Sequence, residues 1–149
     1  EVFGQSYSEL FFLDEATALA AGHRPCGECQ NQRYKQFKNA WIYANNIGIS
    51  LPVKEMDKKI HQDRLTADKK KKTFQAKISD LPIGTFFEYD SKAIVIFKDN
   101  HYLVWSFDGY QQEVELPNDL IVNVLTPESF VKAFDEGFIP RFHHSASLK

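Results

Sequence analysis

The chain has 149 residues and a mass of 17.2 kDa, which fits one domain or two small lobes. Hydrophobic residues make up 43% and aromatic residues 14% of the sequence, so disordered, collagen-like and low-complexity classes are excluded. The formal net charge of −2 excludes the strongly basic footprint that by itself indicates nucleic-acid binding. No apolar run approaches the roughly 18 residues of a transmembrane helix, and no signal-peptide pattern is present. We therefore expect a cytoplasmic protein that does not contact membranes.

The first third of the chain predicts a helical lobe. Glu9–Leu13 is a short apolar run that favours a strand, whereas Asp14–Ala21 combines an Asp N-cap with good helix formers and ends at Gly22. A second helix is predicted for Gln30–Asn45, because large apolar residues recur there at three- and four-residue spacing. A third helix fits Lys54–Leu65, with Met56 and Ile60 facing inward.

The rest of the chain predicts a sheet and one more helix. A lysine-rich linker at 67–72 divides the helical lobe, 1–66, from a second part at 73–149, in which the hydrophobic period changes to two. The five strands predicted there are Phe74–Ile78, Thr85–Tyr89, Ala93–Lys98, Tyr102–Phe107 and Leu120–Leu125. Thr126 is the predicted N-cap of a last helix, which Gly137 ends. The expected fold class is α+β: a helical lobe, a small antiparallel five-stranded sheet or partial barrel, and a C-terminal helix.

The strongest chemical signal is the C-x-x-C pair, Cys26 and Cys29, which contains both cysteines of the chain. Two cysteines so close together favour metal or redox chemistry in a reducing compartment over a disulfide framework. The start of the following helix favours the thiolate form of a cysteine. Zinc prefers four ligands in a tetrahedron, so a zinc-knuckle-like corner needs two more donors.

Histidines are the candidates for the missing zinc ligands. The candidates are His23, His61, His101, His143 and His144. A Gly-x-x-Pro stop after a helix occurs twice, at 22–25 and at 137–140, and alignment of the two copies places Cys29 opposite His144. On this basis we assign His143 and His144 as metal ligands; the alternative is that the two stops are unrelated helix ends and that both histidines belong to a docked C-terminal tail with a polar contact. Three alternatives stay open: ligands that preceded Glu1 in a longer chain, a thiol–disulfide exchange pair, and two reduced thiols that bind nothing.

The sequence carries two resemblances, of which the first supports the metal assignment. The segment Leu19–Gln30, with its A-A-G-x-R-P-C-x-x-C core, resembles the second cysteine pair of the Ada-type metal-binding domain, over residues 9–45 only. That resemblance implies zinc ligation by Cys26 and Cys29 next to DNA, but the cysteine pair that carries methyl transfer in that family has no counterpart here. The whole chain also resembles a family of uncharacterised bacterial proteins with an A-A-G-H-R-P-C-x-E-C block, which implies no particular activity.

The leading functional hypothesis is a zinc-binding protein that contacts nucleic acid through its helical lobe. Arg24, Arg33, Lys35 and Lys38 flank the cysteine corner and are the predicted phosphate-facing residues.

Two other classes of function compete with this hypothesis. One is a metal-dependent hydrolase or nuclease that uses His61, His143 or His144; His61 follows Asp57 by four residues, which places both on one helix face. The other is a protein-interaction module, in which Tyr102, Trp105 or Tyr110 would form an exposed aromatic patch on the sheet.

Overall fold

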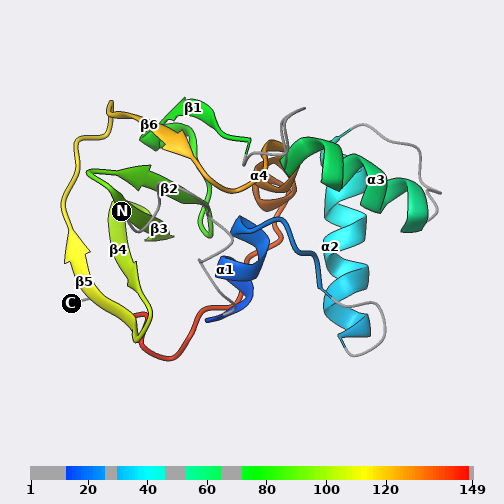
Figure 1. Cartoon of the computed structure of the whole chain (residues 1–149), viewed down its shortest axis with the longest axis horizontal. Helices are drawn as coiled ribbons and strands as arrows, with labels where there is room; N and C mark the ends of the chain where they lie inside the picture. Colours follow the sequence, from blue (N-terminus) through cyan, green and yellow to red (C-terminus); the bar gives the residue numbers. More distant parts are fainter. Residues whose placement is uncertain (1–12, 26–29, 46–52, 65–71, 148–149) are drawn as a thin grey trace.

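The computed structural model describes residues 13–25, 30–45, 53–64 and 72–147, and shows helices beside an antiparallel sheet (Figure 1). The helices are α1 (Glu15–Ala20), α2 (Asn31–Ala44), α3 (Val53–Arg64) and α4 (Glu128–Asp135). The strands are β1 (Phe74–Lys77), β2 (Phe86–Tyr89), β3 (Lys92–Lys98), β4 (His101–Ser106), β5 (Gly109–Val114) and β6 (Ile121–Val124). A single 3-10 turn, Ile78–Asp80, follows β1. The predicted α+β class, with helices before an antiparallel sheet and a helix after it, is confirmed.

The sheet has six described strands rather than the predicted five. Their order is β1-β6-β2-β3-β4-β5, and all neighbours are antiparallel. The additional strand is β5, whose Gln-Gln-Glu centre lacks the apolar alternation of its neighbours. The order places β1 and β5 at opposite edges, so the sheet is open and not a closed barrel. Asp90 and Ser91 both have positive φ, as a two-residue hairpin between β2 and β3 requires.

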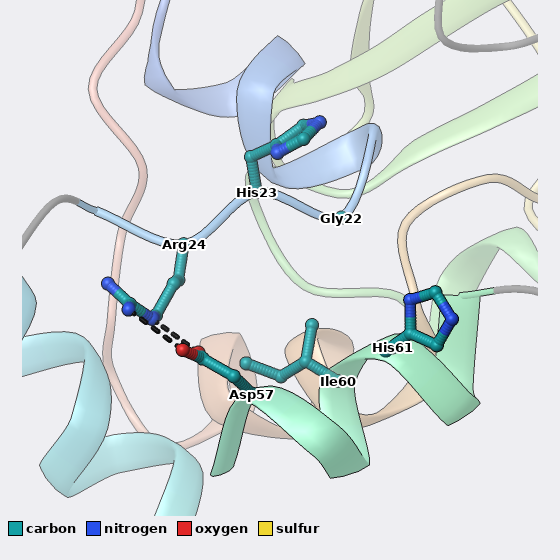
Figure 2. A pocket seen from close by; sticks show the side chains of 6 residues that line it. All are labelled: Gly22, His23, Arg24, Asp57, Ile60 and His61. Carbon is teal, nitrogen blue, oxygen red and sulfur yellow. Dashed lines mark hydrogen bonds and ion pairs between the residues drawn. The ribbon is translucent and has the colours of Figure 1, made fainter. Parts of the chain in front are cut away.

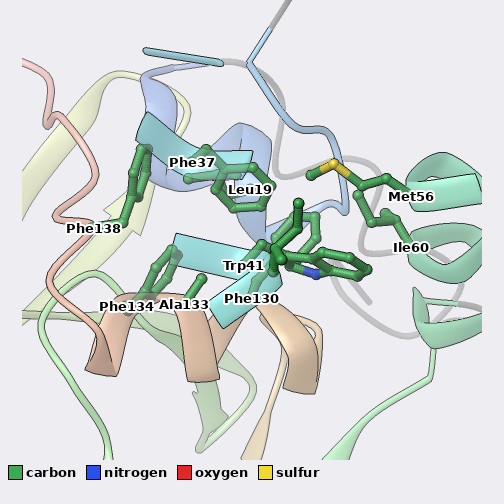
Figure 3. Close-up of a cluster of buried hydrophobic side chains, with 10 residues drawn as sticks. Leu19, Phe37, Trp41, Met56, Ile60, Phe130, Ala133, Phe134 and Phe138 are labelled. Carbon is green, nitrogen blue, oxygen red and sulfur yellow. The ribbon is translucent and has the colours of Figure 1, made fainter. Parts of the chain in front are cut away.

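The short helix α1 joins two hydrophobic cores. Its Ala16 and Ala20 pack with the sheet residues Phe86, Leu103 and Tyr110. One position before Ala20, Leu19 enters the core that α2, α3 and α4 build (Figure 3). Asp14 caps the helix as predicted, because its carboxylate accepts a hydrogen bond from the Thr17 N–H at 2.8 Å.

The C-terminal helix α4 belongs to the helical core. Phe130 of α4 and Phe138, which follows this helix, contact the Phe37 ring of α2 edge-on, at centroid distances of 4.9 and 5.2 Å (Figure 3). The structure corrects one detail of the predicted helix start. Thr126 does not cap α4; its buried hydroxyl oxygen accepts a hydrogen bond from the Phe86 N–H at 2.9 Å, and Pro127 occupies the N-cap position. Gly137, with φ of 106°, ends the helix region as predicted.

Two predicted segments fall on residues that the structure leaves out. The predicted strand Glu9–Leu13 lies outside the described residues except for Leu13, and the linker 67–72 lies outside them except for Lys72. Among the described helices, none combines the length and the apolar character needed to cross a bilayer.

Candidate functional site

A pocket of about 360 Å³ lies between the end of α1 and helix α3. Its lining residues are Gly22, His23, Arg24, Asp57, Ile60 and His61 (Figure 2). Gly22 shapes the wall of this pocket, because its φ of 90° turns the chain out of α1. The Gly22 and His23 N–H groups both donate back to carbonyls of α1, at 2.9 Å each.

The ion pair of Arg24 with Asp57 closes one side of the pocket. Arg24 Nε and Nη2 donate to the two carboxylate oxygens of Asp57, at 2.6 and 3.0 Å. Arg24 Nη1 also donates to the Pro25 carbonyl oxygen at 2.9 Å, and its guanidinium lies 5.0 Å from the ring centre of the buried Tyr34. Hydrogen bonds from all three nitrogens of this guanidinium hold the backbone in place just before the cysteine pair.

Helix α3 divides its residues between the core and the pocket. Met56 and Ile60 are buried in the helical core, as the sequence predicts. Asp57 and His61, each one position further along, share the adjoining face that borders the pocket. Figure 2 shows the ion pair on one side and the exposed imidazoles of His23 and His61 toward the other.

The predicted cysteine ligands, Cys26 and Cys29, lie outside the described residues, but both flanks are described. Pro25 is buried before them, and α2 begins at Asn31 just after them. The N-cap residue Gln30 makes no side-chain hydrogen bond to the helix, and the first turn of α2 contains no acidic residue. The Gln30 side chain therefore accepts no hydrogen bond from the N–H groups at this helix start. Such N–H groups favour the thiolate form of a nearby cysteine.

The other predicted metal ligands, His143 and His144, lie in the C-terminal segment and not beside α2. Figure 1 shows this segment, in red, running away from α4 toward β5, whereas α2 begins on the other side of α1. The ring of His143 is already bonded: its Nδ1 accepts a hydrogen bond from the Ser145 N–H at 3.1 Å and lies 2.8 Å from Ser145 Oγ. Within the described parts of the chain, no three His, Cys, Asp or Glu side chains are grouped so as to hold a metal ion.

Two of the four predicted phosphate-facing residues are bound to carboxylates within the protein. Arg24 pairs with Asp57, as described above. Arg33 pairs with Glu15 of α1 and also donates to the Ile139 carbonyl oxygen at 2.9 Å. Lys35 is exposed and Lys38 is half-buried on α2, so these two lysines carry the prediction of phosphate contact.

The aromatic patch expected for a protein-interaction module is not formed by the predicted residues. Tyr102, Trp105 and Tyr110 are 3%, 5% and 0% exposed and belong to the sheet cores.

Sequence reasoning missed that Arg24 binds Asp57. Nothing in the sequence indicates that the turn after α1 meets helix α3, so the sequence offers no signal for this pair. Comparisons with family models, curated proteins and solved structures find no match to this chain. The residues themselves therefore carry the functional argument.

Proposed function

We propose that the helical lobe is a zinc-binding module in which Cys26 and Cys29 supply two thiolate ligands. The observation that supports this proposal most directly is the position of the pair in the sequence, just before the start of α2, where the described cap residue Gln30 makes no side-chain hydrogen bond to the helix and the first turn contains no acidic residue. Partial positive charge at a helix start stabilises thiolates, and the thiolate is the form of cysteine that binds metal. Two cysteines separated by two residues have the spacing of the commonest structural zinc sites.

The anchored approach to the cysteines adds to this argument. Arg24 is bound by Asp57 and holds the Pro25 carbonyl, so the chain enters the C-x-x-C pair from a fixed point. Fixed flanks lower the entropy that a metal-binding turn loses when it orders around its ion. The role that fits such a zinc site is structural. The same hypothesis predicts that Lys35 and Lys38 contact nucleic acid.

Cobalt substitution tests the proposal, because tetrahedral Co²⁺ absorbs visible light and thiolate ligands add a charge-transfer band. We expect the reduced full chain to bind Co²⁺ with this band and to release it to Zn²⁺. Cys26→Ser and Cys29→Ser should each lower the affinity by more than the roughly tenfold that loss of an outer-shell partner costs. His101→Asn is the matched control, because His101 pairs with Glu113 on the sheet, 2.8 Å away.

The outcome also decides the ligand set. If His143→Asn and His144→Asn leave the Co²⁺ spectrum unchanged, their assignment as ligands is wrong and the other donors lie elsewhere. Absence of the charge-transfer band at stoichiometric metal would overturn the zinc proposal itself. Ready oxidation of the pair to a disulfide in a glutathione buffer, with no metal bound, would favour thiol–disulfide exchange instead.

A further inference from the structure

A second pocket, of about 560 Å³, lies between α2 and the turn that follows α4. Helix α2 lines one wall with Asn39, Tyr43 and their neighbours, and residues 136–139 line the other. We call this pocket the α2–α4 groove. It is larger than the pocket between α1 and α3, and its volume falls in the range of about 300 to 1,000 Å³ that is usual for ligand sites. The zinc proposal makes no use of it.

Two large hydrophobic side chains that line the α2–α4 groove are exposed to solvent. Tyr43 is 73% exposed and Ile139 is 56% exposed, whereas the other large apolar residues of α2 and α4 are buried. Tyrosine is enriched at interfaces, because its ring offers apolar contact while its hydroxyl remains hydrated. No described atom lies within 4 Å of a Cβ placed on Gly137, so the groove wall is also uncovered at that residue.

The groove carries a negative charge that no ion pair within the described residues balances. Glu136, at the end of α4, is exposed and is not paired with Lys132, which lies one turn earlier. The carbonyl groups of the last turn of α4 add partial negative charge. Arg33 also lines the groove, but its charge is balanced by Glu15, and its guanidinium packs 4.4 Å from the ring centre of Phe138. The groove therefore favours a cation over a phosphate.

We infer that the α2–α4 groove binds an arginine side chain of a partner protein, carried on an extended peptide segment. A guanidinium is planar and charged, so it can stack on the exposed Tyr43 ring while its N–H groups donate to the Glu136 carboxylate. Asn39, four residues before Tyr43 and on the same face of α2, offers an amide oxygen to a further N–H group. The ammonium of lysine has no flat face and no fork of donors, so it fits this set of groups less well.

The exposed Ile139 favours a peptide over free arginine. An apolar residue next to the arginine of a peptide can contact Ile139, which lines the same groove. Free arginine lacks such a neighbour, and its own carboxylate would be repelled by Glu136. The inference does not depend on the zinc proposal, because it uses neither the cysteine pair nor any histidine.

NMR titration of the full chain with the peptide Gly-Leu-Arg-Leu-Gly, blocked at both ends, tests this inference. We expect the amide signals of Asn39, Tyr43 and Gly137 to shift together, with a dissociation constant below about 1 mM, while the signals of β3 stay in place. Citrulline in place of arginine keeps the shape of the side chain but removes its charge, so that peptide should bind about fivefold more weakly. The peptide with lysine should also bind more weakly than the arginine peptide.

Variants of exposed residues locate the binding without disturbing the core. Glu136→Gln and Tyr43→Ala should each weaken binding of the arginine peptide about three- to fivefold. Tyr43→Phe keeps the ring and should bind as wild type does. Glu128→Gln is the matched control, because it removes an exposed carboxylate from the other end of α4, and it should leave the affinity unchanged.

Several results would overturn the inference. These are no binding at about 1 mM peptide, equal affinity for the citrulline or the lysine peptide, and equal weakening by Glu128→Gln and Glu136→Gln. If the arginine peptide does not bind, two further measurements show what occupies the groove instead. An oligonucleotide that binds less tightly to Tyr43→Ala would assign it to nucleic acid, and dimerisation that Tyr43→Ala abolishes would assign it to a second copy of the chain.

Discussion

At the scale of single residues, Arg24 connects the turn after α1 to helix α3. Its guanidinium donates two hydrogen bonds to Asp57 and one to the Pro25 carbonyl oxygen. The side chain of Arg24 is 22% exposed and that of Asp57 is 45% exposed, so water screens part of the attraction. The bidentate geometry is nevertheless the one in which an arginine pair contributes most.

Asp57→Asn tests how much this pair contributes to stability. The amide keeps the shape of the side chain but loses its charge and one acceptor, so we expect the free energy of unfolding to fall by about 1 kcal/mol. Urea denaturation at neutral pH and low salt measures the change. Glu55→Gln, at an exposed position in the first turn of the same helix, is the matched control. Equal effects of the two substitutions would mean that the ion pair adds nothing to stability.

The sequence indicates the neighbours of a side chain only where they are local. Asp57 and His61 were predicted to share a helix face, and both border the pocket, because a four-residue spacing fixes that relation. The partners of Arg24 and Arg33 are 33 and 18 residues away, and they depend on how the helices pack. From their positive charge near the cysteine pair, Arg24 and Arg33 were predicted to contact phosphate. In the structure they instead bind carboxylates of the protein itself.

At the scale of elements, the sequence likewise predicts the features that depend on nearby residues and misses those that depend on residues far along the chain. Helices α1, α2 and α3 follow from caps and periodicity, and their predicted bounds agree with the structure to within a residue or two. Strand β5 was not predicted, because it lies at the edge of the sheet, where polar residues are tolerated, and its sequence therefore lacks the alternation of apolar residues. Thr126 was taken for a cap because its hydroxyl partner, the Phe86 N–H, lies 40 residues away.

Gly84 provides a test of how the C-terminal segment packs on the sheet. A Cβ at this position would lie 2.5 Å from Pro140 Cδ, and φ is 99°. Gly137 has a similar φ of 106° but no atom within 4 Å of a Cβ. We expect Gly137→Ala to cost about 1 kcal/mol from backbone strain, and Gly84→Ala to cost more because the clash with Pro140 adds to that strain.

A double-mutant cycle isolates the contact between Gly84 and Pro140. Pro140→Ala removes the ring atoms that a Cβ on residue 84 would meet, so Gly84→Ala should cost less in that background than in the wild type. Urea denaturation of the four proteins gives the coupling free energy. Additive effects would show that the segment moves aside without loss of stability.

At the scale of the whole molecule, α1 and the C-terminal segment couple the two predicted lobes. Helix α1 contributes to the helical core and to one of the sheet cores, and Tyr110 of the sheet donates its hydroxyl hydrogen to Asp14, the cap of that helix, at 2.8 Å. The Tyr110 side chain is fully buried. Burial first, and then the charge and the hydrogen bond of Asp14, raise its pKa well above the ordinary value.

This raised pKa predicts a loss of stability in alkali. Unfolded Tyr110 loses its proton above about pH 10, whereas folded Tyr110 keeps it, so the unfolded state binds fewer protons and stability falls as pH rises. The contribution is fully present below pH 10 and decreases above it by about 1.4 kcal/mol per pH unit. Tyr102, whose pKa is raised by burial and by Asp99, adds a smaller slope of the same sign.

Tyr110→Phe separates this effect from other alkaline titrations. The variant loses the hydrogen bond to Asp14, so it should be about 1 kcal/mol less stable than wild type at pH 8. Because it has no phenol to ionise, its stability should fall less steeply above pH 10, and the two curves should converge or cross near about pH 11. Tyr43→Phe, at a side chain that is 73% exposed, should run parallel to wild type throughout. If the Tyr110→Phe curve also runs parallel, the Tyr110 hydroxyl is not the group that links alkaline pH to the junction of α1 and the sheet.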